Sequence, residues 1–258
     1  LKNGNLRIGT ILSFILGFGL YGSTFIIPLY TQSTLGWTAQ QSGALMIPAA
    51  LTTAFMMPII GKLLQRGVKQ QFLVAAGMLV FFVYSFWGYK IITPDTGADA
   101  FFWMLIARGV GLGLLFIPIT ALALSTLKGQ EIGQGASFTG MMRQLGGSFG
   151  VATITTFLSH QNMVHRESLV SRLDINSAAV QQRVSAIQHS FIAKGMTPDR
   201  ALKASYQALD FNVTKQAAVL SYMDVFLYLG IMFLICIPFV LFVRANKKQK
   251  IDLAEAMH

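Results

Sequence analysis

Six long apolar segments dominate this sequence and limit what it can fold into. The length of each is close to the number of residues, about 20, that a helix needs to cross a lipid bilayer. The segments occupy residues 8–30, 43–64, 72–89, 101–127, 135–158 and 217–243. Only 12% of the 258 residues are charged and 53% are hydrophobic, whereas soluble domains carry about twice this charged fraction. The sequence therefore predicts an all-α integral membrane protein with six transmembrane helices.

The positive charges predict how these helices are oriented. The net charge is +10, and Lys and Arg accumulate in the short cytoplasmic loops of membrane proteins. If Arg7 is cytoplasmic, only Lys90 lies in a short outside loop, and the cytoplasmic segments hold Lys2, Arg7, Lys62, Arg66, Lys69, Lys128, Arg244, Lys247, Lys248 and Lys250. Both termini are then cytoplasmic, residues 244–258 form a basic cytoplasmic tail, and no nucleic acid is needed to explain the charge.

Residues 159–216 are a long polar insertion, which this orientation places outside the cytoplasm. Long loops are translocated largely regardless of their charge, so its cations do not contradict the assignment. Before Gly195, apolar residues recur with helical spacing at Val180, Val184, Ile187 and Phe191. Thr197 and Pro198 then form the start signal of a second helix toward Leu209. We predict an extracytoplasmic helical insertion made of two short amphipathic helices on the outer face.

Two arginines lie within the predicted spans. Arg143 is about 15 Å along its helix from Gly133, and therefore near the bilayer midplane. An unpartnered cation there is unfavourable by at least a few kcal/mol and usually faces the bundle interior. We expect Arg143 to act in a polar pathway or its gating, with a purely structural cation as the alternative. Arg108 is about 10 Å along its helix from Phe101. This shallower position fits a gating role and snorkelling of the side chain to the outer surface equally well.

Residues for catalysis or metal binding do not converge in the sequence. The four histidines lie in polar segments without metal-ligand spacing, so we expect no metal or cofactor. The glycine patterns at 17–22 and 146–150 lie in apolar spans, without the strand that a dinucleotide site or a nucleophile elbow requires. Asp224 is the only carboxylate inside a span, near its outer end, where contact with lipid headgroups is the simplest interpretation. We therefore do not expect an enzyme.

The turn after the second span carries a family resemblance. Residues 61–69 read G-K-L-L-Q-R-G-V-K, which resembles G-x-L-x-D-R-x-G-R-R, the basic loop motif of the major facilitator superfamily. Gln65 replaces the acidic residue of that motif, which weakens its charge relay. The resemblance implies a gating role for Gly61, Lys62 and Arg66 at the cytoplasmic end of the second helix.

Three further stretches narrow the resemblance to one branch. Residues 35–43, residues 108–113 with Pro118, and residues 142–152 resemble parts of the C-terminal domain of the fourteen-helix drug/proton antiporters of the multidrug-resistance protein B type. The resemblance implies that residues 1–258 are the C-terminal six-helix domain, a 3+3 inverted repeat, and that an N-terminal half is missing. It also implies export of amphipathic toxic compounds in exchange for protons across the cytoplasmic membrane of a bacterium. Arg108 and Pro118 are the gating candidates in the fourth helix.

Aromatic, methionine and polar side chains supply the lining for a drug cavity of broad specificity. Several share a helix face because they are spaced at i and i+4. The candidate substrate-binding or pathway residues are Arg143, Tyr21, Phe25, Phe116, Thr120, Phe138, Met142 and Gln144. For any single apolar member, helix packing or lipid contact explains its position equally well.

The expected partners follow from the resemblance. They are amphipathic drugs and protons, the lipid bilayer, and the missing N-terminal half, which should supply the proton-carrying carboxylate. For residues 159–216 we favour a solvated cap over the domain, and the alternative, which the resemblance implies because some relatives have such a partner, is a docking surface for a periplasmic adaptor protein. Two other functions stay open: a metabolite or nutrient carrier that selects through Gln32, Thr120 and Gln144, and a membrane assembly subunit that does not transport.

Overall fold

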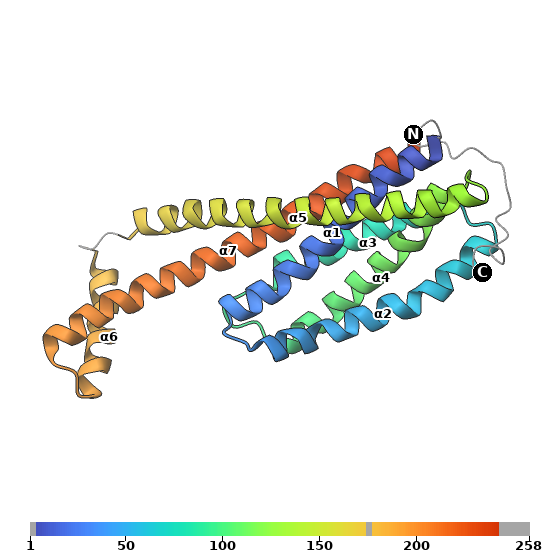
Figure 1. The fold of residues 1–258 in the computed structure, drawn as a ribbon. Helices are drawn as coiled ribbons and strands as arrows, with labels where there is room; N and C mark the ends of the chain where they lie inside the picture. Colours follow the sequence, from blue (N-terminus) through green and yellow to red (C-terminus); the bar gives the residue numbers. More distant parts are fainter. Residues whose placement is uncertain (1–3, 174–176, 243–258) are drawn as a thin grey trace.

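Helices make up every regular element of the residues that the structure describes. The computed structural model describes residues 4–173 and 177–242, so the predicted basic tail at 244–258 lies outside them. The helices are α1 (Gly4–Ser33), α2 (Ala39–Gln65), α3 (Gln70–Ile91), α4 (Ala98–Leu124), α5 (Gln130–Ser171), α6 (Ala178–Ala193) and α7 (Pro198–Phe242). The protein is therefore all-α, as the sequence predicts (Figure 1).

Five of the described helices are long and apolar enough to cross a membrane, namely α1, α2, α3, α4 and α7. The predicted fifth span, 135–158, forms part of α5, which is not among these five. Arg143, Gln144 and many Gly, Ser and Thr residues lower its hydropathy. Even so, α5 packs along α1 and α7 within the bundle (Figure 1). The chain is a multi-pass membrane protein, and α5 is the least hydrophobic helix of its bundle.

Of the two helices predicted within residues 159–216, the first is α6 (Ala178–Ala193) and the second does begin at Pro198, but the prediction that the second helix is short is wrong. α5 runs on past the fifth predicted span, and α7 begins at Pro198 and continues unbroken for 45 residues through the sixth. The reason is that neither Gly nor Pro occurs at 151–171 or 199–229 to stop a helix. Within the described residues, α6 is the short helix that remains separate, and it ends before Gly195, which has a φ of +91°.

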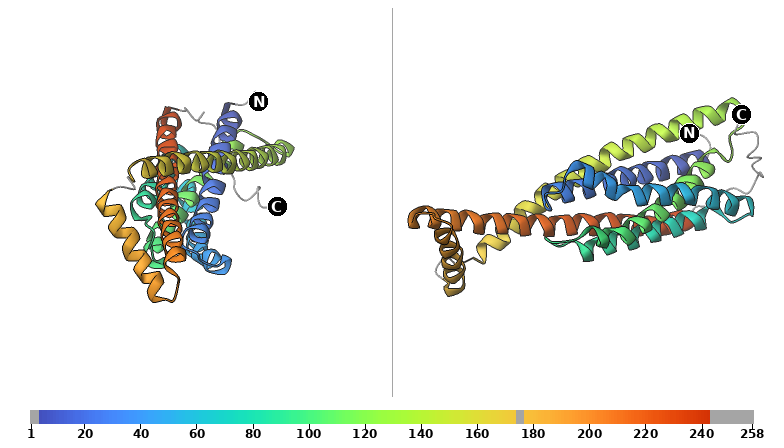
Figure 2. Two further views of the ribbon diagram at one scale, coloured as in Figure 1. Left: turned by 90° about the vertical axis from the view of Figure 1, so that its left-hand side faces the viewer. Right: turned by 90° about the horizontal axis from the view of Figure 1, so that it is seen from below.

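α5 and α7 project beyond the other helices on the side that the charge distribution places outside. The hydroxyls of Ser33, the last residue of α1, and Tyr222 of α7 are 2.8 Å apart, so Tyr222 marks the level at which α1 ends. The part of α7 before Tyr222 then reaches about 36 Å further, at 1.5 Å per residue. α6 packs across its far end (Figures 1 and 2). We call residues 162–173 and 177–221 the outer extension.

Glycines bring two pairs of helices into close contact. A Cβ atom at Gly150 of α5 would lie 2.8 Å from the carbonyl oxygen of Phe18 of α1. One at Gly109 of α4 would lie 2.6 Å from the carbonyl oxygen of Ala49 of α2. Both glycines belong to G-x-x-x-G pairs, a spacing that lets membrane helices approach backbone to backbone. The two central helices of the candidate site, α4 and α5, are thereby fixed in place.

Aromatic side chains fill the core between α3 and α7. Phe81 and Phe233 have ring centroids 4.3 Å apart, and Tyr84 and Phe226 have centroids 5.9 Å apart. All four side chains are fully buried. These four side chains form an aromatic core between α3 and α7, and Phe233 also packs against Gly19 of α1.

Candidate functional site

Arg108 is held in the interior between α4 and α1. The residue is only 6% exposed, and its Nε donates a hydrogen bond of 2.9 Å to Ser23 Oγ. Its Nη2 donates to Thr24 Oγ1 and, at 3.4 Å, to the carbonyl oxygen of Leu20. The side chain therefore points into the bundle and not to the outer surface, and neutral groups of α1 accept its hydrogen bonds.

Arg143 lies in a different setting between α5 and α4. Its guanidinium carbon is 4.2 Å from the centre of the Phe116 ring, so the cation stacks on the aromatic face. Its Nη2 donates a long hydrogen bond of 3.3 Å to Thr120 Oγ1, and its Nε is buried without an acceptor. The structure brings together three sequence candidates, Arg143, Phe116 and Thr120, and leaves the guanidinium short of acceptors.

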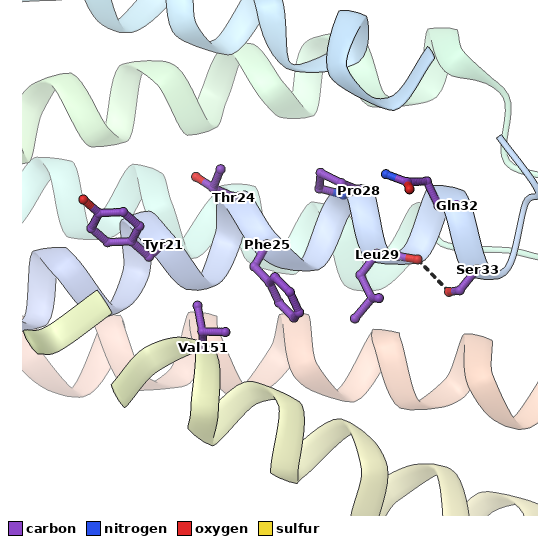
Figure 3. Close-up of a pocket in the computed structure, with 8 residues that line it drawn as sticks. All are labelled: Tyr21, Thr24, Phe25, Pro28, Leu29, Gln32, Ser33 and Val151. Carbon is purple, nitrogen blue, oxygen red and sulfur yellow. Dashed lines mark hydrogen bonds between the residues drawn. The ribbon is translucent and has the colours of Figure 1, made fainter. Parts of the chain in front are cut away.

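A pocket of about 730 Å³ opens along α1, as Figure 3 shows. Its wall is mostly apolar and comes from one helix face plus one residue of α5, and it comprises Tyr21, Thr24, Phe25, Pro28, Leu29, Gln32, Ser33 and Val151. The sequence candidates Tyr21 and Phe25 belong to this wall. Volumes of this size accommodate drug-sized molecules.

The pocket and the Arg143 region meet at Tyr21. The Tyr21 hydroxyl donates a hydrogen bond of 2.9 Å to Gln144 Oε1, the residue after Arg143. Gly17, one helical turn before Tyr21, packs against the backbone of Arg143. Thr24 of the pocket wall accepts a hydrogen bond from Arg108. Arg108 therefore contacts a residue of the pocket wall, and Arg143 precedes the residue that bonds Tyr21 at the inner end of the wall, while neither arginine lines the pocket itself.

Glycines on α5 allow this helix to pack closely against α1 next to Arg143. A Cβ atom at Gly146 would collide with the Phe14 backbone, and one at Gly147 with the Tyr21 ring. Gly140, on the same helix, has no atom of another helix near its Cβ position. The side of α5 that carries Gly146 and Gly147 is thus the side that approaches α1, and this approach places Gln144 beside Tyr21.

The remaining sequence candidates do not join this pocket. Phe138 and Met142 are half-buried on α5, and no described contact links them to the pocket wall. Pro118 is buried inside α4. The loop-motif residues Gly61, Lys62 and Arg66 lie at the C-terminal end of α2, where Lys62 and Arg66 are exposed and Arg66 caps the helix.

Sequence reasoning missed the partners of Asp224. Gln161 Nε2 donates a hydrogen bond of 2.8 Å to Asp224 Oδ2, and His165 Nε2 lies 2.7 Å from the same oxygen. The interpretation of Asp224 as a residue that reaches only lipid headgroups is therefore wrong. The partners exist because α5 continues past residue 158. Gln161 and His165 are spaced at i, i+4 in a segment without helix breakers, and this spacing indicates that they share one helix face.

Metal-binding geometry is not found in the part of the chain that the structure describes, where no three His, Cys, Asp or Glu side chains gather closely enough to hold an ion. The polar groups of the site are two guanidinium groups, hydroxyls and the amides of Gln32 and Gln144. Such a set binds and orients a ligand through hydrogen bonds and positive charge.

Comparison with known proteins identifies the family. The sequence model of the Major Facilitator Superfamily matches residues 1–151. The chain is 26% identical over 240 residues to the fatty acid resistance protein FarB of Neisseria gonorrhoeae, covering 93% of this chain and 45% of that protein. It is 24% identical over 245 residues to the multidrug export protein EmrB of Escherichia coli K12, covering 94% and 46%.

A shorter match is more similar. The multidrug resistance protein B homolog of Mycobacterium tuberculosis H37Rv is 32% identical over 155 residues, which cover 57% of this chain and 27% of that protein. The chain spans about half the length of FarB and EmrB. From the match to the family model and the helical membrane fold together, this chain belongs to the major facilitator superfamily, in the branch that contains these multidrug export and resistance proteins.

Proposed function

We propose that this chain is the C-terminal six-helix half of a multidrug efflux transporter, which exports amphipathic toxic compounds in exchange for protons across the cytoplasmic membrane of a bacterium. The observation that carries the proposal is the junction, at Tyr21, of an apolar pocket of about 730 Å³ with Gln144, which follows the incompletely hydrogen-bonded Arg143. Amphipathic compounds need an apolar wall and a polar anchor, and this junction offers both.

A second half would complete the pocket. The wall described here comes from α1 and one residue of α5, so the opposite wall must come from elsewhere in the full-length transporter. Half-transporter folds bind substrate near the membrane midplane between their two repeats or halves. The relatives are about twice as long as this chain, which supports a missing N-terminal half. A native polypeptide with an intact mass near 28.2 kDa would mean that the second half is a separate polypeptide with which this one must pair, and a mass about twice as large would mean that both halves belong to one chain.

Proton coupling requires a carboxylate that this half does not clearly provide. Among the described residues, Asp224 is the carboxylate within a predicted span, and it is hydrogen-bonded at the outer end. We place the coupling carboxylate in the N-terminal half. Full proton coupling after replacement of every intramembrane carboxylate upstream of this chain would rule that placement out.

Gating is assigned to two regions. Arg108, with Pro118 on the same helix, ties α4 to α1 through Ser23 and Thr24, so a relative movement of these helices must break or exchange those hydrogen bonds. Gly61, Lys62 and Arg66 lie at the end of α2 that the charge distribution makes cytoplasmic, where a basic turn can contact the other half.

The outer extension supports docking of an adaptor protein on residues 159–216. It carries exposed apolar side chains well beyond the end of α1, of which Phe211 is 69% exposed. Exposed apolar patches on a protein surface are typical of protein contacts. Loss of co-purification of an adaptor on Phe211→Asp, with unchanged yield of the transporter, is the expected result.

Drug accumulation in a strain that lacks its own efflux pumps tests the proposal. The full-length transporter should lower accumulation of structurally unrelated amphipaths, and collapse of the proton gradient should abolish this effect. A narrow profile confined to one metabolite would favour the carrier alternative, whose selectivity would come from Gln32 in the pocket wall, Gln144 and Thr120. Unchanged drug sensitivity after deletion of the gene, with loss of a partner complex, would favour the non-transporting assembly subunit.

A further inference from the structure

The hydroxyl of Tyr84 on α3 lies in the core of the bundle without a partner. The Tyr84 side chain is fully buried, and its hydroxyl has no hydrogen-bond partner within the described part of the chain. Its ring packs beside the apolar rings of Phe81 and Phe226. A buried hydroxyl without a partner costs free energy comparable to a lost hydrogen bond. Phenylalanine would fill the same space without that cost, so the hydroxyl needs an explanation.

Helix packing places Tyr84 at the level of Arg108 on α4. A Cβ atom at Gly111 would lie 3.2 Å from the backbone nitrogen of Phe81, so α3 and α4 nearly touch there. The two helices follow each other in the chain and run antiparallel, and Tyr84 comes three residues after Phe81, as Arg108 comes three residues before Gly111. The Arg108 charge is close enough to act on the Tyr84 hydroxyl. The hydroxyl without a partner therefore lies beside a guanidinium group.

Arg108 directs its described hydrogen bonds to α1 in this structure. Its Nε donates to Ser23, and its Nη2 donates to Thr24 and to the carbonyl oxygen of Leu20. Tyr84 of α3 accepts none of these bonds. The guanidinium group of α4 thus has acceptors on two neighbouring helices, and only those on α1 are occupied.

Glycines fix α3 against α4. A Cβ atom at Gly77 would lie 2.9 Å from the Cβ atom of Leu114, and Gly111 approaches α3 in the same way at Phe81. Helices packed this closely move together, because interiors at this density do not deform continuously. The free acceptor at Tyr84 therefore stays beside Arg108 when other helices move.

The contact between α1 and α4 is built differently at its two ends. Near the inner end of α1, Gly9 packs against Ala123 of α4. About 21 Å further along α1, at 1.5 Å per residue, the contact includes the hydrogen bonds from Arg108 to Ser23 and Thr24. Hydrogen bonds can exchange partners, whereas a glycine contact cannot. Release of these bonds therefore allows α1 to pivot about its inner end.

We propose that Tyr84 is the second acceptor of Arg108, to which the guanidinium group transfers its hydrogen bond when it releases α1 during the transport cycle. Tyr84 is then a positioning residue that acts through Arg108. The exchange keeps the buried cation hydrogen-bonded in both states, and a state without an acceptor for it would be too unfavourable to populate. The inference deepens the proposed function, on which it rests, because it names the exchange partner of the gating arginine.

Tyr84→Phe in the full-length transporter removes the hydroxyl alone. The state described here loses no hydrogen bond, so the melting temperature should stay the same or rise. The state with Arg108 on Tyr84 loses its acceptor, so the maximal rate of rhodamine 6G export should fall about tenfold. KM should change by less than about twofold, because Tyr84 does not line the pocket. An unchanged maximal rate would overturn the proposal.

Ser13→Ala on α1 is the matched control. The Ser13 hydroxyl is also buried and without a partner among the described residues, and it lies about 15 Å along α1 from Ser23. This variant should leave the melting temperature, the maximal rate and KM unchanged. A lower melting temperature of Tyr84→Phe would show that its hydroxyl is already hydrogen-bonded in the present state, which contradicts the exchange.

A double variant tests whether Tyr84 acts through Arg108. Adding Tyr84→Phe to Arg108→Gln should lower the maximal rate no further than Arg108→Gln alone, because the second acceptor then has no guanidinium group to receive. Independent, multiplicative losses in the double variant would show that Tyr84 acts by another route, and would refute its role as the exchange partner.

Spin labels report the exchange without any transported compound. In the cysteine-free transporter in lipid nanodiscs, labels at Ile11→Cys of α1 and Trp103→Cys of α4 replace exposed side chains. Tyr84→Phe should shift the distance distribution about tenfold toward one state, and identical distributions in wild type and variant would contradict the exchange. If the distribution shifts but unrelated amphipaths are not exported, the efflux function is refuted and the exchange stands. Export at equal rates by wild type and Tyr84→Phe refutes the exchange and leaves the efflux function intact.

Discussion

The surroundings of Arg108 and Arg143 place the same side chain in two different roles. Arg108 is almost fully buried and donates to three acceptors, all on α1. Arg143 is half-buried, stacks on Phe116 and has one long hydrogen bond with an unsatisfied Nε. The difference teaches that a membrane arginine whose hydrogen bonds are made within its own fold ties helices together. An arginine whose donors are partly unsatisfied is available to a ligand.

The largest expected effect concerns the glycine contact that positions Arg143. Gly146→Ala should lower the thermal stability and abolish transport, because the new methyl group would collide with the Phe14 backbone, which cannot rotate away. Overpacking of this kind costs about 1–3 kcal/mol. Gly140→Ala on the same helix, where the Cβ position is open, is the matched control. Thermal unfolding in detergent measures both, and equal stability of the two variants would contradict the close α1–α5 contact.

The next effect separates the two arginines directly. Arg108→Gln should lower the melting temperature, because it removes interhelical hydrogen bonds to Ser23 and Thr24, which are worth about 1–3 kcal/mol together. Arg143→Gln should leave the melting temperature within error and reduce transport. If Arg143→Gln proves the more destabilising change, the assignment of structural and ligand-binding roles is reversed.

A smaller effect is expected at the base of the outer extension. Asp224→Asn weakens the link to His165 and Gln161 and should increase hydrogen exchange in α5 around residue 165, with a stability change of about 1 kcal/mol after solvent screening. Its transport of neutral amphipaths should stay close to wild type. Loss of all transport in Asp224→Asn would show that this acid takes part in proton coupling, which the proposed function assigns to the other half.

The smallest effect is expected for the ion pair Arg166–Asp210. The two groups are 2.7 Å apart but both side chains are about half exposed. Exposed pairs contribute about 0–1 kcal/mol, so Asp210→Asn should shift neither the melting temperature nor transport measurably. A shift as large as that of Asp224→Asn would show that the outer extension depends on surface charge.

The sequence was sufficient to predict the membrane class and the resemblance to the superfamily. Apolar segment length and the loop cations carry that information over many residues, so single substitutions do not erase it. Helix ends were predicted well where a stop signal exists, as at Gly195, and poorly where none exists, as in α5 and α7.

The candidate site was predictable by residue type but not by pairing. An arginine inside a span draws attention on energetic grounds alone, and aromatic residues at i, i+4 spacing indicate a shared face. Spacing cannot show that Thr24 bonds Arg108 while the neighbouring Tyr21 bonds Gln144, because that depends on how α1 is rotated between α4 and α5. Nor can it show that Phe138 and Met142 lie away from the pocket.

Accessibility of the α1 pocket tests the central claim most directly. In a cysteine-free full-length transporter, with Cys236 replaced by Ser, Phe25→Cys should react with a membrane-impermeant maleimide, and a transported amphipathic compound should protect it. Leu79→Cys is the control, since Leu79 is 51% exposed on α3 and outside the pocket. The account predicts substrate-dependent labelling at residue 25 and none at residue 79. Equal labelling at residue 25 with and without substrate would contradict the claim that this pocket binds the transported compound.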